Sequence, residues 1–148
     1  LPESNIKKAD SQNVCSFGSC CDQVTDSNRY CYRAQCMATT KNIVAELGWG
    51  DDRYSIAFQS RFGRQAWIQP YLDEHLEKLL ETGVKKIAVV TPSFVSDCLE
   101  TIHEIGIEYR EQFMEGGGEV FQLVPNLNDE PVWFDSVYEI SQSHQNQT

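Results

Sequence analysis

The alternation of helical and strand-like segments constrains the fold of this chain more than any other feature. Helices are predicted over 35–47, 69–82, 93–114 and 132–141, and short strands over 54–58, 85–91 and 120–124. The run KKIAVVT (85–91) is apolar and β-branched, which is typical of a strand buried on both faces of a parallel sheet. Because such alternation builds parallel sheets through right-handed crossovers, we predict an α/β fold with three layers, a small parallel sheet flanked by helices.

Length and charge exclude several classes of protein. The 148 residues suit one domain, predicted over 1–148, and the polar tail 142–148 is predicted to fray. The formal net charge of −10 argues against sequence-independent binding to nucleic acid, which relies on Lys and Arg. No apolar run approaches the roughly 20 residues that span a bilayer, and no signal peptide opens the chain. We therefore expect a soluble, acidic, cytoplasmic domain.

Five of the six cysteines gather between positions 15 and 36. They are Cys15, Cys20, Cys21, Cys31 and Cys36. The segment 11–28 has neither helical nor strand periodicity, so we predict irregular structure that needs an external staple. Disulfide frameworks are typical of small secreted domains, whereas this chain is long enough to form its own core. Crowded thiols in a reducing compartment indicate a metal ion or an iron–sulfur cluster instead.

The predicted helix over 93–114 carries a row of carboxylates. Asp97, Glu100, Glu104 and Glu108 are spaced i, i+3, i+7 and i+11, which places them on one face. A solvated acidic face is one interpretation. The other is a site, because Asp97 and Glu100 follow the carboxyl end of a predicted strand, where α/β sheets bind ligands. Partial desolvation there would raise the pKa of a carboxyl and let it accept or relay protons.

Two loops follow the other predicted strands. The loop 59–67 mixes two Arg, Phe, Gly and Trp67, which fits a pocket for a flat, partly anionic ligand, or a surface loop whose Trp67 packs onto the core. The loop 126–131 is polar, and it is also consistent with a plain helix start, with Asp129 as N-cap and Pro131 in the first turn.

Three stretches of the chain closely resemble the C-terminal half of ferrochelatases, in order and spacing. They are SIAFQSRFGRQAWIQPYLDE, VVTPSFVSDCLETIHEIGIEYRE and VPNLNDEPVWFD, and the resemblance extends over about 35–138. Ferrochelatases insert ferrous iron into a porphyrin in haem synthesis. The resemblance implies a chelatase-like lobe, half of a two-lobed enzyme, with porphyrin and Fe²⁺ as substrates.

The resemblance also implies roles for individual residues. Glu100 corresponds to the active-site Glu of the family, and Asp97 is assigned with it to the catalytic site. Glu104 and Glu108 would form a path for protons or metal. The porphyrin pocket would be lined by Gln59, Ser60 and Trp67. Cys98 stands where many members carry His, and His75 and His103 match no catalytic His.

The start of the chain resembles the end of a His-Gly-Leu-Pro motif of the family. The catalytic His would then precede Leu1, and the N-terminal lobe of the same polypeptide would lie outside this chain. We expect the full-length parent to be active and this fragment to be inactive alone. A homo-oligomer is possible in this interpretation, and any peripheral membrane contact would come from the missing lobe.

The cysteine-rich segment 11–31 is interpreted as an insertion in the family pattern. Some ferrochelatases hold a 2Fe–2S cluster, often through a C-terminal extension with several Cys. Cys36 lies where cluster-free relatives also carry Cys, which leaves a C-x4-C-C-x9-C set as cluster ligands: Cys15, Cys20, Cys21 and Cys31. Structural zinc, or plain thiols or disulfides, are the alternatives.

Two other functions remain open. The first is a non-catalytic iron–sulfur or redox-sensing module on a chelatase-like domain. The second is a related chelatase that inserts cobalt or nickel.

Overall fold

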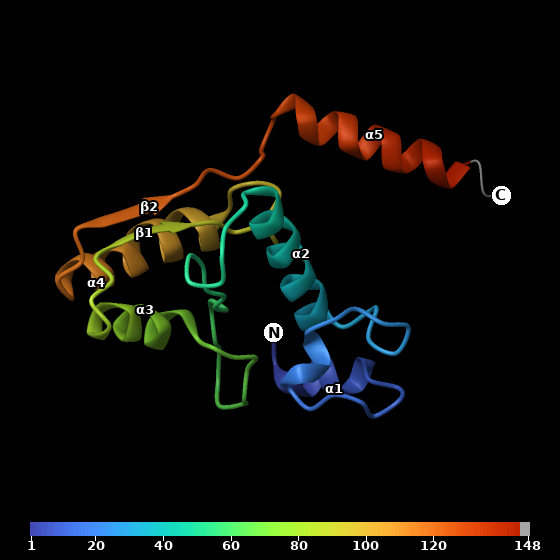
Figure 1. The fold of residues 1–148 in the computed structure, drawn as a ribbon, viewed down its shortest axis with the longest axis horizontal. Helices are drawn as coiled ribbons and strands as arrows, with labels where there is room; N and C mark the ends of the chain where they lie inside the picture. The colour runs from blue at the N-terminus through green and yellow to red at the C-terminus, as the bar shows by residue number, and fades with distance from the viewer. Residues whose placement is uncertain (146–148) are drawn as a thin grey trace. The chain divides into compact units, whose positions relative to one another are not determined.

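The structure, a computed structural model, describes residues 1–145 and separates the chain into two compact units. The first unit spans Leu1–Val84 and the second spans Lys85–Thr148 (Figure 1). Each unit buries apolar side chains of its own, so each has a core that can be described by itself.

The first unit is helical, and its N-terminal residues help to tie it together. Its elements are α1 (Glu3–Ala9), η1 (Ser19–Cys21), α2 (Tyr32–Glu46) and α3 (Leu72–Glu81). The backbone N–H of Glu3 donates to the carbonyl of Ala66 over 2.9 Å, and that of Ile68 donates to the carbonyl of Leu1 over 3.1 Å. These bonds form an isolated antiparallel bridge that holds the first residues of the chain against residues 66–68.

Helix α3 forms because leucines recur at helical spacing and a glycine follows its end. Leu76 is 1% exposed and anchors the helix in the core of the first unit. Gly83 has φ of 86°, a left-handed conformation that glycine adopts without steric cost and that commonly ends a helix. The helices predicted over 35–47 and 69–82 are confirmed, with shifted boundaries.

The second unit contains the parallel sheet. Its elements are β1 (Lys86–Val89), η2 (Glu100–Tyr109), α4 (Arg110–Glu115), β2 (Val120–Leu123) and α5 (Pro131–Gln145). Strands β1 and β2 pair in parallel, with Ile87 opposite Phe121 and Val89 opposite Leu123. The helical connection η2–α4 links them, as a parallel pair requires (Figure 1).

One face of the sheet packs against the connecting helix. The rings of Phe113 in α4 and Phe121 in β2 lie 5.9 Å apart, and these residues are 0% and 7% exposed. On η2, a Cβ atom added to Gly106 would lie 3.2 Å from a methyl of Leu123, so helix and strand are in close contact there. This face supplies the core of the second unit.

The other face of the sheet is open, and the prediction that strand 85–91 is buried on both faces is wrong for this structure. Exposure alternates along β1, with Lys86 and Ala88 exposed and Ile87 and Val89 partly buried. Alternation arises because the described part of the second unit packs η2 and α4 on one face only.

The predicted strand over 54–58 does not form, so the described sheet has two strands and not three. Only Phe58 makes a bridge, in parallel with Tyr71: its N–H donates to the carbonyl of Pro70 over 2.8 Å, and its carbonyl accepts from Leu72 over 3.0 Å. A strand is stable only when it pairs along its length with a neighbouring strand. The segment 54–58 has only these two backbone hydrogen bonds to residues 70–72.

The long helix predicted over 93–114 begins later in the chain than its periodicity suggests. Its first part is also a wider helix than an α-helix. Residues 92–98 consist of turns, bends and irregular backbone, and Glu100–Tyr109 is a π-helix, with i→i+5 bonds, that continues into α4. Asp97 therefore lies in the loop before the helix and not on its face. Helix α5 is also longer than the predicted 132–141; of the tail predicted to fray, residues up to Gln145 are helical and 146–148 lie outside the described residues.

Candidate functional site

The carboxyl ends of β1 and β2 bring two polar loops together in the second unit. Parallel strands end at the same edge of a sheet, so the loop after β1 meets the loop after β2. The hydroxyl of Thr91 donates to Oδ1 of Asn126 over 2.7 Å, and the backbone N–H of Asn128 donates to the carbonyl of Val95 over 3.0 Å. Of the three loops predicted to follow strands, the two that follow β1 and β2 therefore meet in this unit.

Asp97 is the centre of these contacts. Its Oδ1 accepts from Nδ2 of Asn126 over 3.0 Å and from the hydroxyl of Thr101 over 3.1 Å, and its Oδ2 accepts from Nδ2 of Asn128 over 2.7 Å. The Asn128 amide, followed by the other donors, lowers the pKa of Asp97. The raised pKa expected from desolvation is therefore wrong for this carboxyl.

Glu100 is the first residue of η2, and its side chain is exposed. A hydrogen bond from Cys98 is the main cause that lowers the pKa of Glu100, so this carboxyl too is ionised at neutral pH rather than shifted upward. Cys98, at the position where the resemblance expects His, is thus in contact with Glu100. An exposed, ionised carboxylate can accept a proton or attract a cation.

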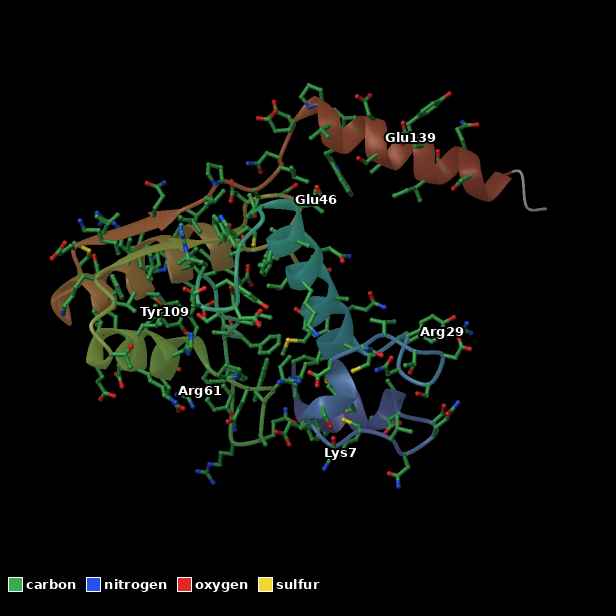
Figure 2. All side chains as sticks on the ribbon, in the orientation of Figure 1. Lys7, Arg29, Glu46, Arg61, Tyr109 and Glu139 are labelled. Carbon is green, nitrogen blue, oxygen red and sulfur yellow. The ribbon has the colours of Figure 1, made fainter. Side chains whose placement is uncertain are left out.

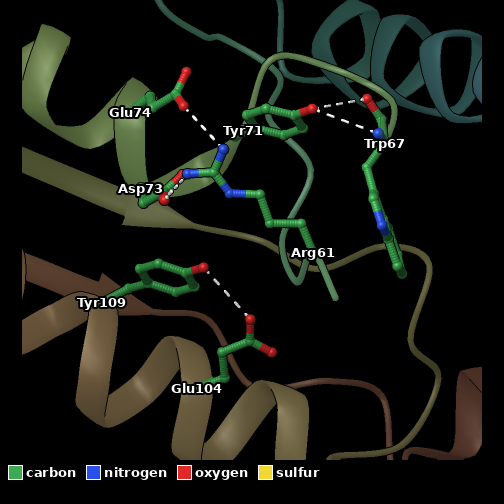
Figure 3. A network of polar contacts seen from close by, with 7 residues as sticks. All are labelled: Arg61, Trp67, Tyr71, Asp73, Glu74, Glu104 and Tyr109. Atoms are coloured by element: carbon green, nitrogen blue, oxygen red, sulfur yellow. Dashed lines mark hydrogen bonds and ion pairs between the residues drawn. The ribbon is translucent and has the colours of Figure 1, made fainter. Parts of the chain in front are cut away.

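The remaining carboxylates of the row continue along η2. Glu104 is partly buried and its Oε1 accepts from the hydroxyl of Tyr109 over 3.4 Å (Figure 3). Glu108 is exposed, with Oε1 3.3 Å from Nδ1 of His103. Because residues four apart stay neighbours when the bonds run i→i+5, Glu100, Glu104 and Glu108 still follow one side of the helix.

The loop 59–67 lies in the first unit and is shaped by Arg61. The guanidinium of Arg61 is 2.5 Å from Oδ2 of Asp73 and 3.0 Å from Oε1 of Glu74, and it lies 4.3 Å from the centre of the Tyr71 ring (Figure 3). These partners occupy the charge of Arg61. Arg61 is therefore engaged with residues at the start of α3 rather than presented to an anionic ligand.

The three pocket residues predicted in this loop lie close together in sequence and differ in environment. Trp67 is partly buried, and its Nε1 donates to the carbonyl of Phe62 over 3.1 Å. Ser60 has φ of 53°, a left-handed conformation that is uncommon for a non-glycine residue. Nε2 of Gln59 is buried and has no hydrogen-bond partner among the described residues. An unpaired buried amide is costly, so a hydrogen-bond acceptor placed at this Nε2 would be stabilising.

Three of the four predicted thiol ligands line one cavity in the first unit. The cavity has a volume of about 230 Å³, and Cys15, Cys20 and Cys31 contribute to its lining. Sγ of Cys21 lies 3.8 Å from Sγ of Cys20, but Cys21 is only 3% exposed and is not part of this lining. Figure 2 draws the side chains of the described residues, with Lys7 of α1 and Arg29 of the cysteine-rich segment among those labelled.

Hydrogen bonds hold the backbone around these thiols. The carboxylate of Asp10 accepts from the N–H of Cys15 over 2.7 Å. Nδ2 of Asn28 donates to the carbonyl of Cys20 over 2.6 Å, and the carbonyl of Asn28 accepts from the N–H of Cys31 over 2.8 Å. The segment is mostly irregular, as predicted, and side-chain amides and carboxylates replace the missing secondary structure.

The thiols are gathered but are not arranged as ligands. All six cysteines are free. Within residues 1–145, no group of three or more His, Cys, Asp or Glu side chains takes an arrangement that could hold a metal ion. The donor set suits a thiolate-bound group, and binding would require the side chains to turn.

No described helix is both long and apolar enough to cross a membrane.

Asn126 and Asn128 are the residues that the sequence did not single out. The loop 126–131 was expected to be a polar loop or a plain helix start, and α5 does begin at Pro131. One signal could have indicated this contact. The loop after one parallel strand carries two Asn, and the loop after the neighbouring strand is acidic.

Comparison with known proteins assigns the family. The family model described as ferrochelatase matches residues 1–145. A ferrochelatase of Coxiella burnetii (strain Dugway 5J108-111) is 44% identical over 138 residues, 93% of this chain and 39% of the relative. A ferrochelatase of Legionella pneumophila (strain Corby) is 44% identical over 140 residues, 95% of this chain and 42% of the relative. A ferrochelatase of Pseudomonas entomophila (strain L48) is 46% identical over 136 residues, which are 90% of this chain and 40% of the relative. The chain spans less than half the length of these relatives.

Proposed function

The chain belongs to the ferrochelatase family, and from this membership we propose that it is the C-terminal half of an enzyme that inserts Fe²⁺ into a porphyrin in haem biosynthesis. The observation that carries the proposal is the identity of 44–46% with ferrochelatases over 90–95% of the chain. The rest of the enzyme, including its N-terminal lobe, would come from the remainder of the polypeptide. On this proposal the chain alone is inactive.

Glu100 is proposed as the carboxylate that acts on the porphyrin. Metal insertion removes two N–H protons from the porphyrin and brings in a divalent cation. Glu100 is exposed and ionised, so it can accept a proton, while Glu104 and Glu108 behind it can pass on protons or cations along η2. In the first unit, Gln59, Ser60 and Trp67 are proposed to line the porphyrin pocket, with the unpaired Nε2 of Gln59 as a donor to an acidic substituent.

The activity is tested in the complete polypeptide that the gene encodes. Insertion of Fe²⁺ into protoporphyrin is measured anaerobically for the wild type and for Glu100→Gln, which keeps the size of the side chain and removes its basicity. We expect a loss of about 10²–10⁴-fold in kcat, the usual contribution of a general base. Glu111→Gln, an exposed carboxylate of α4, is the matched control and should keep the wild-type rate.

Near-normal turnover of Glu100→Gln would remove Glu100 from the mechanism. Absence of Fe²⁺ insertion by the wild-type complete polypeptide, with loading of Co²⁺ or Ni²⁺ instead, would point to a related chelatase. Absence of insertion of any metal would favour the alternative function, a non-catalytic iron–sulfur or redox-sensing module on a chelatase-like domain.

We further propose that the segment 11–31 binds a 2Fe–2S cluster through Cys15, Cys20, Cys21 and Cys31. Four thiolates are the usual ligand set, and three of these thiols already share a cavity of about 230 Å³. When bound, the cluster would supply redox-active iron and a staple for an irregular segment. Asp10 and Asn28 hold the backbone of the ligating residues, and Cys21 would have to turn from its buried position toward the cavity.

The cluster is tested by visible absorption, EPR, and iron and sulfide analysis of anaerobically purified protein. Cys15→Ser and Cys31→Ser should each abolish the iron–sulfur absorbance, whereas Cys36→Ser, whose thiol is outside the cavity lining, should keep it. Loss of absorbance in Cys36→Ser alone would show that the ligand set is wrong. Bound zinc without iron or sulfide would replace the cluster with a structural zinc site.

A further inference from the structure

We propose that Asp97 is a positioning residue: paired with Asn128, it locks the loop before η2 to the loop after β2 and thereby fixes Glu100. Only the expected effect on turnover rests on the role proposed above for Glu100. The lock itself is a property of the second unit and is argued from its contacts.

Asp97 and Asn128 form a reciprocal pair. The backbone N–H of Asp97 donates to Oδ1 of Asn128 over 2.8 Å, and Nδ2 of Asn128 donates back to Oδ2 of Asp97 over 2.7 Å. Two bonds between the same two residues, 31 positions apart, restrict both distance and orientation. The loops that leave β1 and β2 are therefore joined side chain to backbone and side chain to side chain.

A second set of contacts ties this pair to the core. The other carboxylate oxygen, Oδ1 of Asp97, accepts from Asn126 and from the hydroxyl of Thr101, which is 0% exposed. Asn126 in turn accepts from the hydroxyl of Thr91, the residue two positions beyond the end of β1, which is 8% exposed. Asp97 thus connects the edge of the sheet to the first turn of η2, where Thr101 follows Glu100.

The conformation of Asn128 fits this role. Its φ of 48° lies in the left-handed region, which Asn tolerates better than most residues. Its backbone N–H donates to the carbonyl of Val95, two residues before Asp97. Asn128 therefore contributes its side chain, its backbone and its turn geometry to the same junction.

The contacts separate Asp97 from Glu100 in function. Both oxygens of Asp97 accept hydrogen bonds from side-chain donors, so a proton placed on Asp97 would displace a donor of the junction. Glu100, three residues later, is exposed. The resemblance places both carboxyls at the catalytic site. The geometry instead indicates that Asp97 holds the two loops together and that Glu100 alone reacts with the porphyrin.

The test exchanges the two side chains in the complete polypeptide. Asp97→Asn sets two amides against each other, and Asn128→Asp sets two carboxylates against each other. The double variant Asp97→Asn/Asn128→Asp restores one donor opposite one acceptor with the direction reversed, and it keeps the acceptor for the N–H of residue 97. Asp129→Asn, an exposed neighbour, is the control. The readouts are the thermal midpoint, amide hydrogen exchange over 95–100, and insertion of Fe²⁺ into protoporphyrin.

We expect Asn128→Asp to lower the midpoint by at least about 4 °C, to speed hydrogen exchange over 95–100, and to reduce kcat by about 10–100-fold through misplacement of Glu100. The double variant should recover most of all three, and Asp129→Asn should match the wild type. Recovery of the midpoint and of exchange without recovery of turnover would overturn the proposal, because the carboxylate at 97 would then take part in the chemistry. Recovery of none of the three would also overturn it.

Failure of the proposed function gives a different result. A wild-type polypeptide without Fe²⁺ insertion would refute the ferrochelatase activity, while the midpoint and the exchange rates of the four variants would still show whether the exchanged pair acts as one lock.

Discussion

The thiol of Cys20 has an environment that distinguishes it from its neighbours. The backbone N–H of Ser16 donates to its Sγ over 3.4 Å, and this bond is the main cause that lowers the pKa of Cys20 from 9.0 to about 6. Burial instead raises the pKa of Cys15 and of Cys21. Of these three thiols, Cys20 is therefore a thiolate at neutral pH, and the other two resist ionisation.

Alkylation of metal-free, reduced protein should therefore be selective for Cys20. At pH 7 and limiting iodoacetamide, mass mapping should find Cys20 modified first, with a rate that reaches half its maximum near pH 6, because only the thiolate is the nucleophile. Reaction of Cys15 ahead of Cys20 would contradict this. The sign for stability follows: since the folded state lowers this pKa, the contribution of Cys20 to folding is complete above about pH 9 and is lost as the pH falls through about 6.

Secondary structure could be predicted from sequence where one local period decides it, and not where a distant partner does. The repeats of Leu in α3 and of β-branched residues in β1 predicted those elements. The helix over 93–114 was placed too early because Asp97 hydrogen-bonds to Asn126 and Asn128, about 30 positions away, which keeps residues 92–98 out of the helix. The i→i+5 bonding of η2 is likewise hidden, since its apolar spacing resembles that of an α-helix.

The junction between α4 and β2 depends on Gly118, which gives a second prediction. A Cβ on Gly118 would lie 2.3 Å from the ring of Phe113, a side chain that is 0% exposed, and 2.7 Å from its carbonyl oxygen. Gly118→Ala should therefore destabilise the fold by about 1–3 kcal/mol, the usual cost of overpacking a core. Urea unfolding would measure this. Gly116→Ala is the control, because Gly116 is exposed with φ of −70°, where alanine fits.

At the scale of the whole chain, the two units differ from a complete α/β domain in the apolar surface they leave exposed. The outer face of the sheet exposes Val90 (54%) and Val120 (44%), and α5 exposes Phe134 (55%) and Ile140 (57%). A parallel sheet normally has both faces covered, and the chain spans 39–42% of the length of its relatives. This exposure could not be predicted from the sequence. Apolar spacing indicates which face of a helix or strand tends to be buried, but not whether the surface that buries it lies within the same chain segment.

The exposed apolar side chains of α5 predict how the 148-residue chain behaves alone. Exposed apolar side chains promote association, so sedimentation should show concentration-dependent self-association, which Phe134→Ser/Ile140→Ser should weaken. The double substitution should leave the urea midpoint almost unchanged, because both side chains are more than half exposed in the folded chain and little burial is lost. Phe121→Ser is the contrasting variant: its side chain is 7% exposed against Phe113, so unfolding should become easier by about 3 kcal/mol or more. A large loss of stability in the α5 variant would mean that this face is already packed within the chain.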